Sequence, residues 1–174
     1  MKYAITGHTH GIGNSLFTEL SPNCLGFSRE NGYDISEKSD RERIVSTAFD
    51  CDIFINNAHN SFFQTEMLYD MFTAWKGKDK LIINIGSDTT SGIKKKVWKY
   101  SSEKAALDKA NEQLSFLSDP CKVSMIRFGY VGTDRIINNY NPSSYITLQD
   151  STTFILDQIR WMKRYRIVDV TMIP

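Results

Sequence analysis

The sequence predicts a doubly wound α/β fold, with one domain over residues 1–174 and a mostly parallel sheet of six or seven strands. Short apolar runs alternate along the chain with amphipathic stretches, which is the pattern of repeated strand–helix units. The run at 80–87, KLIINIGS, is apolar on both faces, as expected of a buried parallel strand. A length of 174 residues suits one domain with a proper core.

Each expected element follows from a local pattern. Apolar or β-branched runs predict strands at 2–7, 24–28, 51–58, 80–87, 121–131 and 166–173, with a very short one within 31–36. Apolar residues at helical spacing predict helices at 11–20, 37–49, 62–75, 97–117 and 148–164. Ser21-Pro22 and Asp119-Pro120 end two of these helices. In such a fold, ligands bind beyond the carboxyl ends of the strands.

Composition and charge exclude several classes of function. The net charge is +1, which gives no electrostatic case for binding nucleic acid or an anionic membrane. The basic run at 94–96 is interpreted as a solvated loop. The start of the chain has no signal-peptide pattern, and no apolar run reaches transmembrane length. The odd number of cysteines, 3, indicates reduced thiols, so we expect a cytoplasmic protein.

The stretch TGHTHGIG at 6–13 lies between the first strand and the first helix. A dinucleotide pyrophosphate meets a helix N-terminus at that turn in this kind of fold. The spacing is G-x-x-x-G-x-G rather than G-x-G-x-x-G, and a glycine-rich loop alone is weak evidence. A metal site at His8 and His10 would need more ligands nearby, and the next histidine is His59. We therefore predict phosphate binding here and no metal.

The stretch YSSEK places Tyr100 and Lys104 four residues apart on one face of a predicted helix. A nearby ammonium lowers the pKa of a phenol, so the pair can supply general acid/base catalysis. Ser87 ends the buried strand 13 residues before Tyr100, and its hydroxyl could hold a substrate carbonyl oxygen. Taken alone, the pair could arise by coincidence and Ser87 could simply end the strand.

Five motifs together resemble the short-chain dehydrogenase/reductase family: TGHTHGIG, NNA at 56–58, INIGS at 83–87, YSSEK at 100–104 and RFGYVGT at 127–133. They occur in the family order, each on the expected element, and cover essentially the whole chain. The resemblance implies a Rossmann-fold domain and an oxidoreductase that acts on a small-molecule carbonyl or alcohol substrate. It also implies a homodimer or homotetramer, in which Ala105, Ala106 and Ala110 would permit close packing onto the sheet or onto a partner.

The resemblance implies catalytic roles for four residues. Tyr100 would be the proton donor or acceptor, Lys104 would lower the pKa of Tyr100 and bind the nicotinamide ribose, and Ser87 would orient the substrate oxygen. Family members usually add an Asn whose backbone positions a water next to the Lys. Asn60 fits this role, because it opens the predicted helix and precedes Ser87 by 27 residues.

The resemblance also implies a cofactor site. The pyrophosphate would be held by the first turn, at Gly7, His8, Thr9, His10, Gly11, Ile12 and Gly13. The adenosine side would be lined by Asn57, Ala58, His59, Asp34 and Ile35. The nicotinamide end would be held by Gly129, Val131 and Thr133, together with Tyr100 and Lys104.

The residues after the second strand favour NADP(H) over NAD(H). An NAD site needs a carboxylate there for the ribose 2′-hydroxyl, whereas an Arg accommodates a 2′-phosphate. This chain has Ser28-Arg29 at that place, and His10 could add a positive charge. Glu30 leaves NAD(H) open as the alternative, since it could bind the ribose.

The chain departs from the family pattern in several places. It is short, and the segment between Arg29 and Asp34 has no room for the usual helix. His59 replaces the glycine of NNAG, and Phe128 replaces the proline of RPG. The substrate would be covered by a short, polar loop at 134–145.

Two alternative functions remain open from the sequence. The first is a non-enzymatic dinucleotide-binding regulator, although such proteins typically lose the Tyr or the Lys. The second is a nucleotide-sugar reductase or epimerase of the extended branch, although that branch usually has G-x-x-G-x-x-G and a large C-terminal domain.

Overall fold

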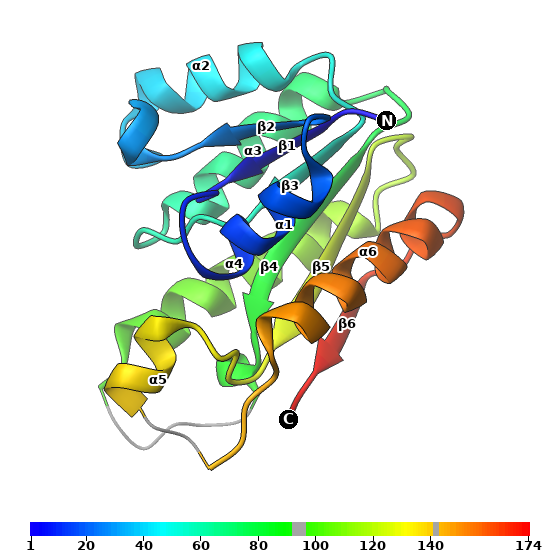
Figure 1. Ribbon diagram of the computed structural model, residues 1–174. Helices are drawn as coiled ribbons and strands as arrows, with labels where there is room; N and C mark the ends of the chain where they lie inside the picture. Colours follow the sequence, from blue (N-terminus) through cyan, green and yellow to red (C-terminus); the bar gives the residue numbers. More distant parts are fainter. Residues whose placement is uncertain (92–96, 141–142) are drawn as a thin grey trace.

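The sheet is six-stranded in the residues that the computed structural model describes, 1–91, 97–140 and 143–174, and every neighbouring pair is parallel (Figure 1). The strand order is β2-β1-β3-β4-β5-β6. The strands are β1 (Tyr3–Thr6), β2 (Cys24–Phe27), β3 (Ile53–Asn56), β4 (Leu81–Ser87), β5 (Lys122–Phe128) and β6 (Asp169–Met172). The predicted fold class is therefore confirmed. The basic run at 94–96 lies outside the described residues.

Helices cover both faces of the sheet (Figure 1). They are α1 (Gly11–Leu20), α2 (Lys38–Ala48), α3 (Phe63–Trp75), α4 (Lys99–Ser115), α5 (Asp134–Tyr140) and α6 (Leu148–Arg164), with 3-10 turns η1 (Arg29–Asn31) and η2 (Asp88–Thr90). Two apolar clusters fill the two interfaces between sheet and helices. Residues alternate between them along β3, because successive side chains of a strand point to opposite faces: Phe54 belongs to one cluster, and Ile53 and Ile55 belong to the other.

The order of the strands reverses between β1 and β3. The chain leaves β1 to build β2 on one side, and it returns through α2 to build β3 on the other side. A crevice opens at such a reversal, beyond the carboxyl ends of the strands, because the two connections diverge there. The TGHTHGIG turn follows β1 and the NNA segment ends β3, so both flank this point.

The structure corrects the very short strand predicted within 31–36. The carboxylate of Asp34 accepts hydrogen bonds from the backbone N–H (2.9 Å) and the hydroxyl (2.8 Å) of Ser36. This local turn uses groups that a strand would offer to its neighbours. The chain therefore passes from η1 directly to α2, and β2 is an edge strand.

Two further expectations change. The segment 134–145 is not simply a loop, because its first half forms α5. Ala110 packs inside the core of its own chain at 3% exposure, so it is not available to a partner, whereas Ala105 is exposed. Within the described ranges, no helix is both long and apolar enough to cross a membrane.

Candidate active site

The first βα turn is shaped by its glycines. Gly7 and Gly11 have φ angles of 72° and 54°, which side chains rarely adopt. A Cβ at Gly13 would overlap the carbonyl oxygen of Gly7. The side-chain amide of Asn57, the residue directly after β3, donates to the carbonyl oxygens of Thr6 (3.0 Å) and Gly7 (3.2 Å). The turn is thus tight and braced from β3.

This turn exposes the N-terminus of α1. His10 precedes the helix, and its side chain makes no capping hydrogen bond to the first backbone N–H groups. Such groups, with the positive end of the helix dipole, favour an anion. Gly7, Thr9 and His10 line a cavity of about 840 Å³ next to the turn, which is the larger of two cavities in this region.

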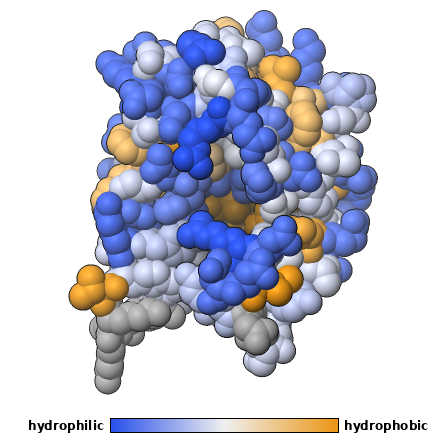
Figure 2. All heavy atoms as spheres, turned by 60° about the vertical axis from the view of Figure 1, so that its left-hand side comes forward, coloured by the Kyte–Doolittle hydropathy of each residue, from blue (hydrophilic) through white to orange (hydrophobic). Residues whose placement is uncertain are grey.

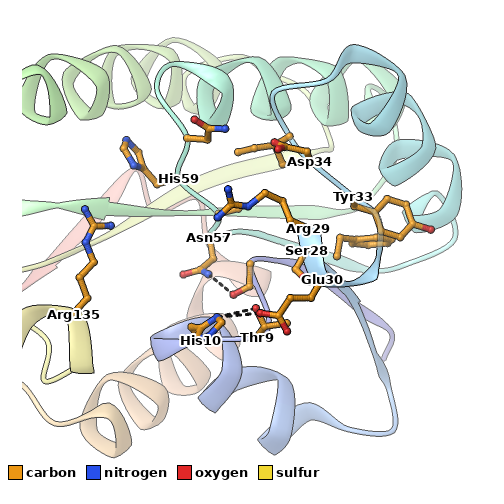
Figure 3. A pocket seen from close by; sticks show the side chains of 15 residues that line it. Thr9, His10, Ser28, Arg29, Glu30, Tyr33, Asp34, Asn57, His59 and Arg135 are labelled. Carbon is orange, nitrogen blue, oxygen red and sulfur yellow. Dashed lines mark hydrogen bonds and ion pairs between the residues drawn. The ribbon is translucent and has the colours of Figure 1, made fainter.

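The far wall of this larger cavity comes from the segment that follows β2. Phe27, Ser28, Arg29 and Glu30 line it, and Figure 3 shows the Arg29 side chain reaching in above the first turn. The backbone N–H of Ser28 donates to the side-chain oxygen of Asn31 (2.7 Å). This hydrogen bond closes the 3-10 turn, so the Ser28 N–H is already bonded within the protein. Arg29 is therefore the exposed cation that this wall presents to a ligand.

His10 and Glu30 both line the larger cavity, and their side chains are in contact. The His10 Nδ1 atom lies 3.5 Å from a Glu30 carboxylate oxygen and 3.0 Å from the Thr9 hydroxyl (Figure 3). Both side chains are exposed, so water screens their interaction strongly. In this geometry Glu30 partly neutralises the charge that a protonated His10 would add beside Arg29.

The residues predicted for the adenosine side all line the larger cavity: Asp34, Ile35, Asn57, Ala58 and His59. Asn60 lines the same cavity. The pKa of Asp34 is lowered, chiefly because the Ser36 backbone N–H donates to its carboxylate, with Asn60 also contributing a hydrogen bond. Asn60 does not open α3, which begins at Phe63. The structure brings Asn60 to Asp34 rather than to Lys104.

A second cavity, of about 530 Å³, gathers the predicted catalytic residues. Ser87 lies at the end of β4, and Tyr100 and Lys104 lie on the first turns of α4. All three line this smaller cavity. The side chains of Ser87 and Tyr100 hydrogen-bond to each other. Two hydroxyls from different elements therefore meet at one point, where a substrate oxygen can be bound.

Burial dominates the protonation of Tyr100. Its pKa is raised above the ordinary value, because loss of solvation outweighs the hydrogen bond with Ser87 and the positive charge of Arg135. The Lys104 ammonium lies 5.7 Å from the centroid of the Tyr100 ring. The sequence predicted a pKa lowered by Lys104, and the structure instead favours a neutral phenol, which is the form that donates a proton.

Lys104 is buried at 4% exposure. Its ammonium donates to the side-chain oxygen of Gln64 (2.8 Å) and to the carbonyl oxygen of Ile85 (2.9 Å). Burial lowers the pKa of Lys104 to about 7, while the carboxylates of Asp108 and Glu103 act in the opposite direction. A group that titrates near neutrality suits acid/base chemistry.

His59 lies between the two cavities and lines both. Its ring packs edge-on against Tyr100 at a centroid distance of 4.9 Å, and its Nε2 atom lies 3.0 Å from a carboxylate oxygen of the buried Glu103. Burial and the Lys104 charge lower the pKa of His59 to about 4, against the raising effect of Glu103. The imidazole is therefore neutral at pH 7.

The nicotinamide end predicted for the site follows β5. Gly129, Val131 and Thr133 line the smaller cavity together with Gly11 and Ile12. The methyl group of Thr133 lies so close to Gly11 that a Cβ there would be 2.9 Å from it. The first turn and the segment that follows β5 are thus in contact. His8 and Gly13 line neither cavity: His8 packs against Phe17 at 4.8 Å between ring centroids.

Helix α5 closes the groove that the two cavities form. Asp134, Arg135, Ile136 and Tyr140 line the smaller cavity, and Arg135 also lines the larger one. In Figure 3 the side chains of Arg135 and Arg29 come from opposite walls. Figure 2 shows a hollow on this side of the molecule, with hydrophilic residues at its rim and apolar atoms within.

Sequence reasoning missed two residues of this site. Arg135 comes two residues after the RFGYVGT motif, within the segment 134–145 that was expected to cover the substrate, so its position could have drawn attention to it. Gln64 precedes Met67, Leu68 and Met71 on the apolar face of α3. A polar residue on such a face needs a hydrogen-bonding partner, and that was the available signal.

Comparison with known proteins reveals the fold but not a sequence relationship. No protein-family model matches the chain. No curated protein matches it either. Among solved structures, a small-chain dehydrogenase in complex with NADPH is 16% identical with a TM-score of 0.79, over 100% of this chain and 96% of that chain.

Two further structures are similar over the same extent. A short chain dehydrogenase from Burkholderia cenocepacia J2315, in complex with NADP, is 20% identical with a TM-score of 0.78, over 99% of this chain and 90% of that one. A 4-hydroxyisoleucine dehydrogenase, complexed with NADH, is 16% identical with a TM-score of 0.79, over 99% and 96%. The chain therefore has the fold of the short-chain dehydrogenases.

Proposed function

We propose that this protein is an NADP(H)-dependent oxidoreductase of the short-chain dehydrogenase/reductase type, acting on a carbonyl or alcohol substrate. The observation that carries the proposal is the convergence of Ser87, Tyr100 and Lys104 in one cavity. That cavity adjoins a second one beside a glycine turn and a helix N-terminus.

The residues present fit a dinucleotide. The overlap that a Cβ at Gly13 would make shows how closely α1 approaches the first turn, as pyrophosphate binding at a helix N-terminus requires. The two cavities, of about 840 and 530 Å³, share Asn57, His59, His10 and Arg135 as lining residues. The adenosine half would occupy the larger cavity and the nicotinamide half the smaller one.

The chemistry of the chain's own groups suits carbonyl reduction. When bound, the nicotinamide would supply a hydride to the substrate carbon, or accept one from it. The Ser87 hydroxyl would hold the substrate oxygen, and Tyr100 would pass its phenolic proton to that oxygen as negative charge develops. Lys104 would donate a hydrogen bond to the nicotinamide ribose and supply positive charge beside the resulting phenolate.

Arg29 supports NADP(H) as the preferred cofactor. It is the exposed cation on the wall that follows β2, where a guanidinium can bind a 2′-phosphate through two parallel hydrogen bonds. Glu30 sits beside His10 rather than alone, which weakens its competition as a ribose ligand. Of the three similar structures described above, two contain NADP or NADPH and one contains NADH.

The test combines binding with turnover. The protein is titrated with NADPH and with NADH by nucleotide fluorescence, and a panel of carbonyl compounds is then screened with the tighter cofactor. Tyr100→Phe should reduce turnover by about 10²–10⁴-fold, the usual contribution of a positioned proton donor, with NADPH affinity nearly unchanged. Tyr69→Phe is the matched control, because Tyr69 is exposed on α3 and bonds Gln113.

Two outcomes would contradict the proposal. Full activity in Tyr100→Phe would remove Tyr100 from the mechanism. NADPH binding without turnover over the whole carbonyl panel would favour a dinucleotide-binding regulator on the same fold.

A further inference from the structure

Gln64 makes a closed set of hydrogen bonds beside Lys104. It lies on the first turn of α3 at 2% exposure. Its side-chain nitrogen donates to the carbonyl oxygens of Asn56 (2.7 Å) and Ile85 (3.1 Å), and its side-chain oxygen accepts from the Lys104 ammonium (2.8 Å). Every polar atom of this buried amide therefore has a partner.

These partners allow only one orientation of the Gln64 amide. Rotating it by half a turn would place its NH₂ group against the Lys104 ammonium and its oxygen against two carbonyl oxygens. Each such contact would leave a buried polar group unsatisfied, which is costly in a dry interior. The oxygen of Gln64 is thus a fixed acceptor aimed at Lys104.

A chain of buried asparagines holds Gln64 in place. The amide of Asn56 donates to the backbone oxygen of Gln64 (2.9 Å) and to the side chain of Asn84 (2.9 Å). Asn84 donates in turn to Asn111 (3.1 Å), which donates to the carbonyl oxygen of Val168 (3.0 Å). These residues connect β3, β4 and α4 to the segment before β6, so the position of Gln64 is determined by the sheet as well as by its own helix.

Lys104 has three N–H bonds, and two of them go to the Gln64 and Ile85 oxygens. Lys104 also lines the smaller cavity, so its third N–H can reach a ligand there. We propose that Gln64 is a positioning residue for Lys104: it fixes the direction of the ammonium and helps keep it charged in a dry site. This inference rests on the proposed function only for its effect on cofactor binding and catalysis.

The contact that Gln64 makes with Lys104 differs from the arrangement that the sequence suggested through Asn60. The expectation was an asparagine whose backbone would position a water beside the lysine. In this chain a side-chain oxygen contacts the ammonium directly, and Asn60 lies at the larger cavity instead. A side-chain acceptor can be altered by substitution, which a backbone carbonyl cannot, so the role of Gln64 is open to a direct test.

Several other charged and titratable groups surround Lys104, and some of them influence its pKa. From α4, Tyr100 lies beside the ammonium, and Glu103 and Asp108 raise the pKa of Lys104. From the segment after β3, His59 lies within reach of the Lys104 charge, which lowers the pKa of His59. From β5, Arg127 forms an ion pair with Asp108 at 3.2 Å. These groups are unchanged in variants of Gln64.

The experiment compares Gln64→Met, which removes the acceptor, with Gln64→Glu, which places a carboxylate next to the ammonium. The first readout is the titration of Lys104 in the protein without nucleotide, followed by NMR of labelled lysines and assigned with Lys104→Met. The second is the pH dependence of NADPH affinity and of kcat/KM. Gln113→Met, an exposed glutamine of α4, is the matched control.

The two variants should move the Lys104 titration in opposite directions, each by about one pH unit. Gln64→Met should lower the pKa, because a buried cation loses an acceptor, and Gln64→Glu should raise it. The pH profiles of NADPH affinity and kcat/KM should shift in the same directions. A purely structural role would lower the melting temperature in both variants without moving these midpoints in opposite directions.

Coincident lysine titrations in wild type, Gln64→Met and Gln64→Glu would overturn the proposal. If Gln64→Met does not fold, Gln64→Asn, which keeps the amide but withdraws it from Lys104, should show the same downward shift. An opposite pair of lysine shifts together with no binding of NADPH or NADH would support the role of Gln64 and contradict the proposed function instead.

Discussion

The two cavities of the groove are built in different ways. The larger one is walled by connecting segments: the first turn, the residues after β2 and those between β3 and α3. The smaller one contains the end of β4, the start of α4 and the segment that follows β5. One of its key groups, Lys104, is hydrogen-bonded to Gln64, which is held in turn by the buried asparagines.

This difference separates two kinds of requirement. Catalytic groups need positions that do not move, which buried hydrogen bonds between rigid elements provide. Discrimination between NADP(H) and NAD(H) needs only charged groups at the surface that can meet a 2′-phosphate. Arg29, His10 and Glu30 are such exposed groups. Substitutions at the smaller cavity should therefore affect chemistry and stability together, whereas those on the outer wall should affect only affinity.

Among the substitutions that test this comparison, the largest effect is expected in the first turn, whose residues line both cavities. In Gly13→Ala the new Cβ would overlap the Gly7 carbonyl oxygen, and forcing the backbone apart should cost about 1–3 kcal/mol of stability. NADPH binding should weaken by up to about 100-fold if the same free energy is lost from the bound state. Thermal unfolding and fluorescence titration measure the two effects.

Gly77→Ala is the control for that substitution. Gly77 also has a positive φ, 77°, but a Cβ there would meet no heavy atom within 4 Å. The Gly77→Ala variant should lose about 1–2 kcal/mol of folding stability from backbone strain, and it should bind NADPH with the wild-type affinity. Equal NADPH affinities in wild type and Gly13→Ala would show that the close approach in the turn is not part of a cofactor site.

A pH-dependent effect is expected at Lys104. Its pKa is lowered from 10.5 to about 7 by burial, so between these values the unfolded chain holds a proton that the folded chain has released. The free energy of unfolding should therefore gain a contribution that rises with pH above 7, by at most about 1.4 kcal/mol per pH unit for one proton. Below pH 7 both states are protonated and this contribution is flat.

Lys104→Met should remove that rise, and urea unfolding at several pH values between 6 and 9 measures it. Lys109→Met, on the exposed face of α4, should keep the wild-type slope. The same slope in wild type and Lys104→Met would mean that Lys104 remains charged in the folded protein throughout this range.

The smallest effect is expected on the outer wall. Arg29→Ala should weaken NADPH binding by about ten-fold, the equivalent of one lost charge-assisted interaction, and should leave NADH affinity and melting temperature unchanged. Arg135→Ala offers a comparison from the opposite wall: it should weaken both nucleotides to a similar extent, since it lines both cavities. Isothermal titration with both nucleotides gives the ratios, and equal losses for NADPH and NADH in Arg29→Ala would contradict a 2′-phosphate contact.

Much of the fold could be predicted because the local patterns agreed with it. The predicted helices at 11–20, 37–49, 62–75, 97–117 and 148–164 all occur with small changes at their ends. The strand predicted within 31–36 was wrong because the Asp34–Ser36 hydrogen bonds form a turn. A run of six residues does not reveal whether its polar atoms will bond within the run or to a neighbouring strand.

The sequence alone determined the parallel α/β architecture and the positions of Gly7, Gly11, Ser87, Tyr100 and Lys104 on it. These follow from hydrophobic periodicity and from the rule that strand ends share one edge of the sheet. Only the tertiary structure decided that the side chain of Gln64 contacts Lys104, that Arg135 borders both cavities, and that burial raises the pKa of Tyr100. The reason is physical: periodicity depends on neighbours within one helix or strand, whereas desolvation and hydrogen-bond partners depend on how separate elements pack against one another.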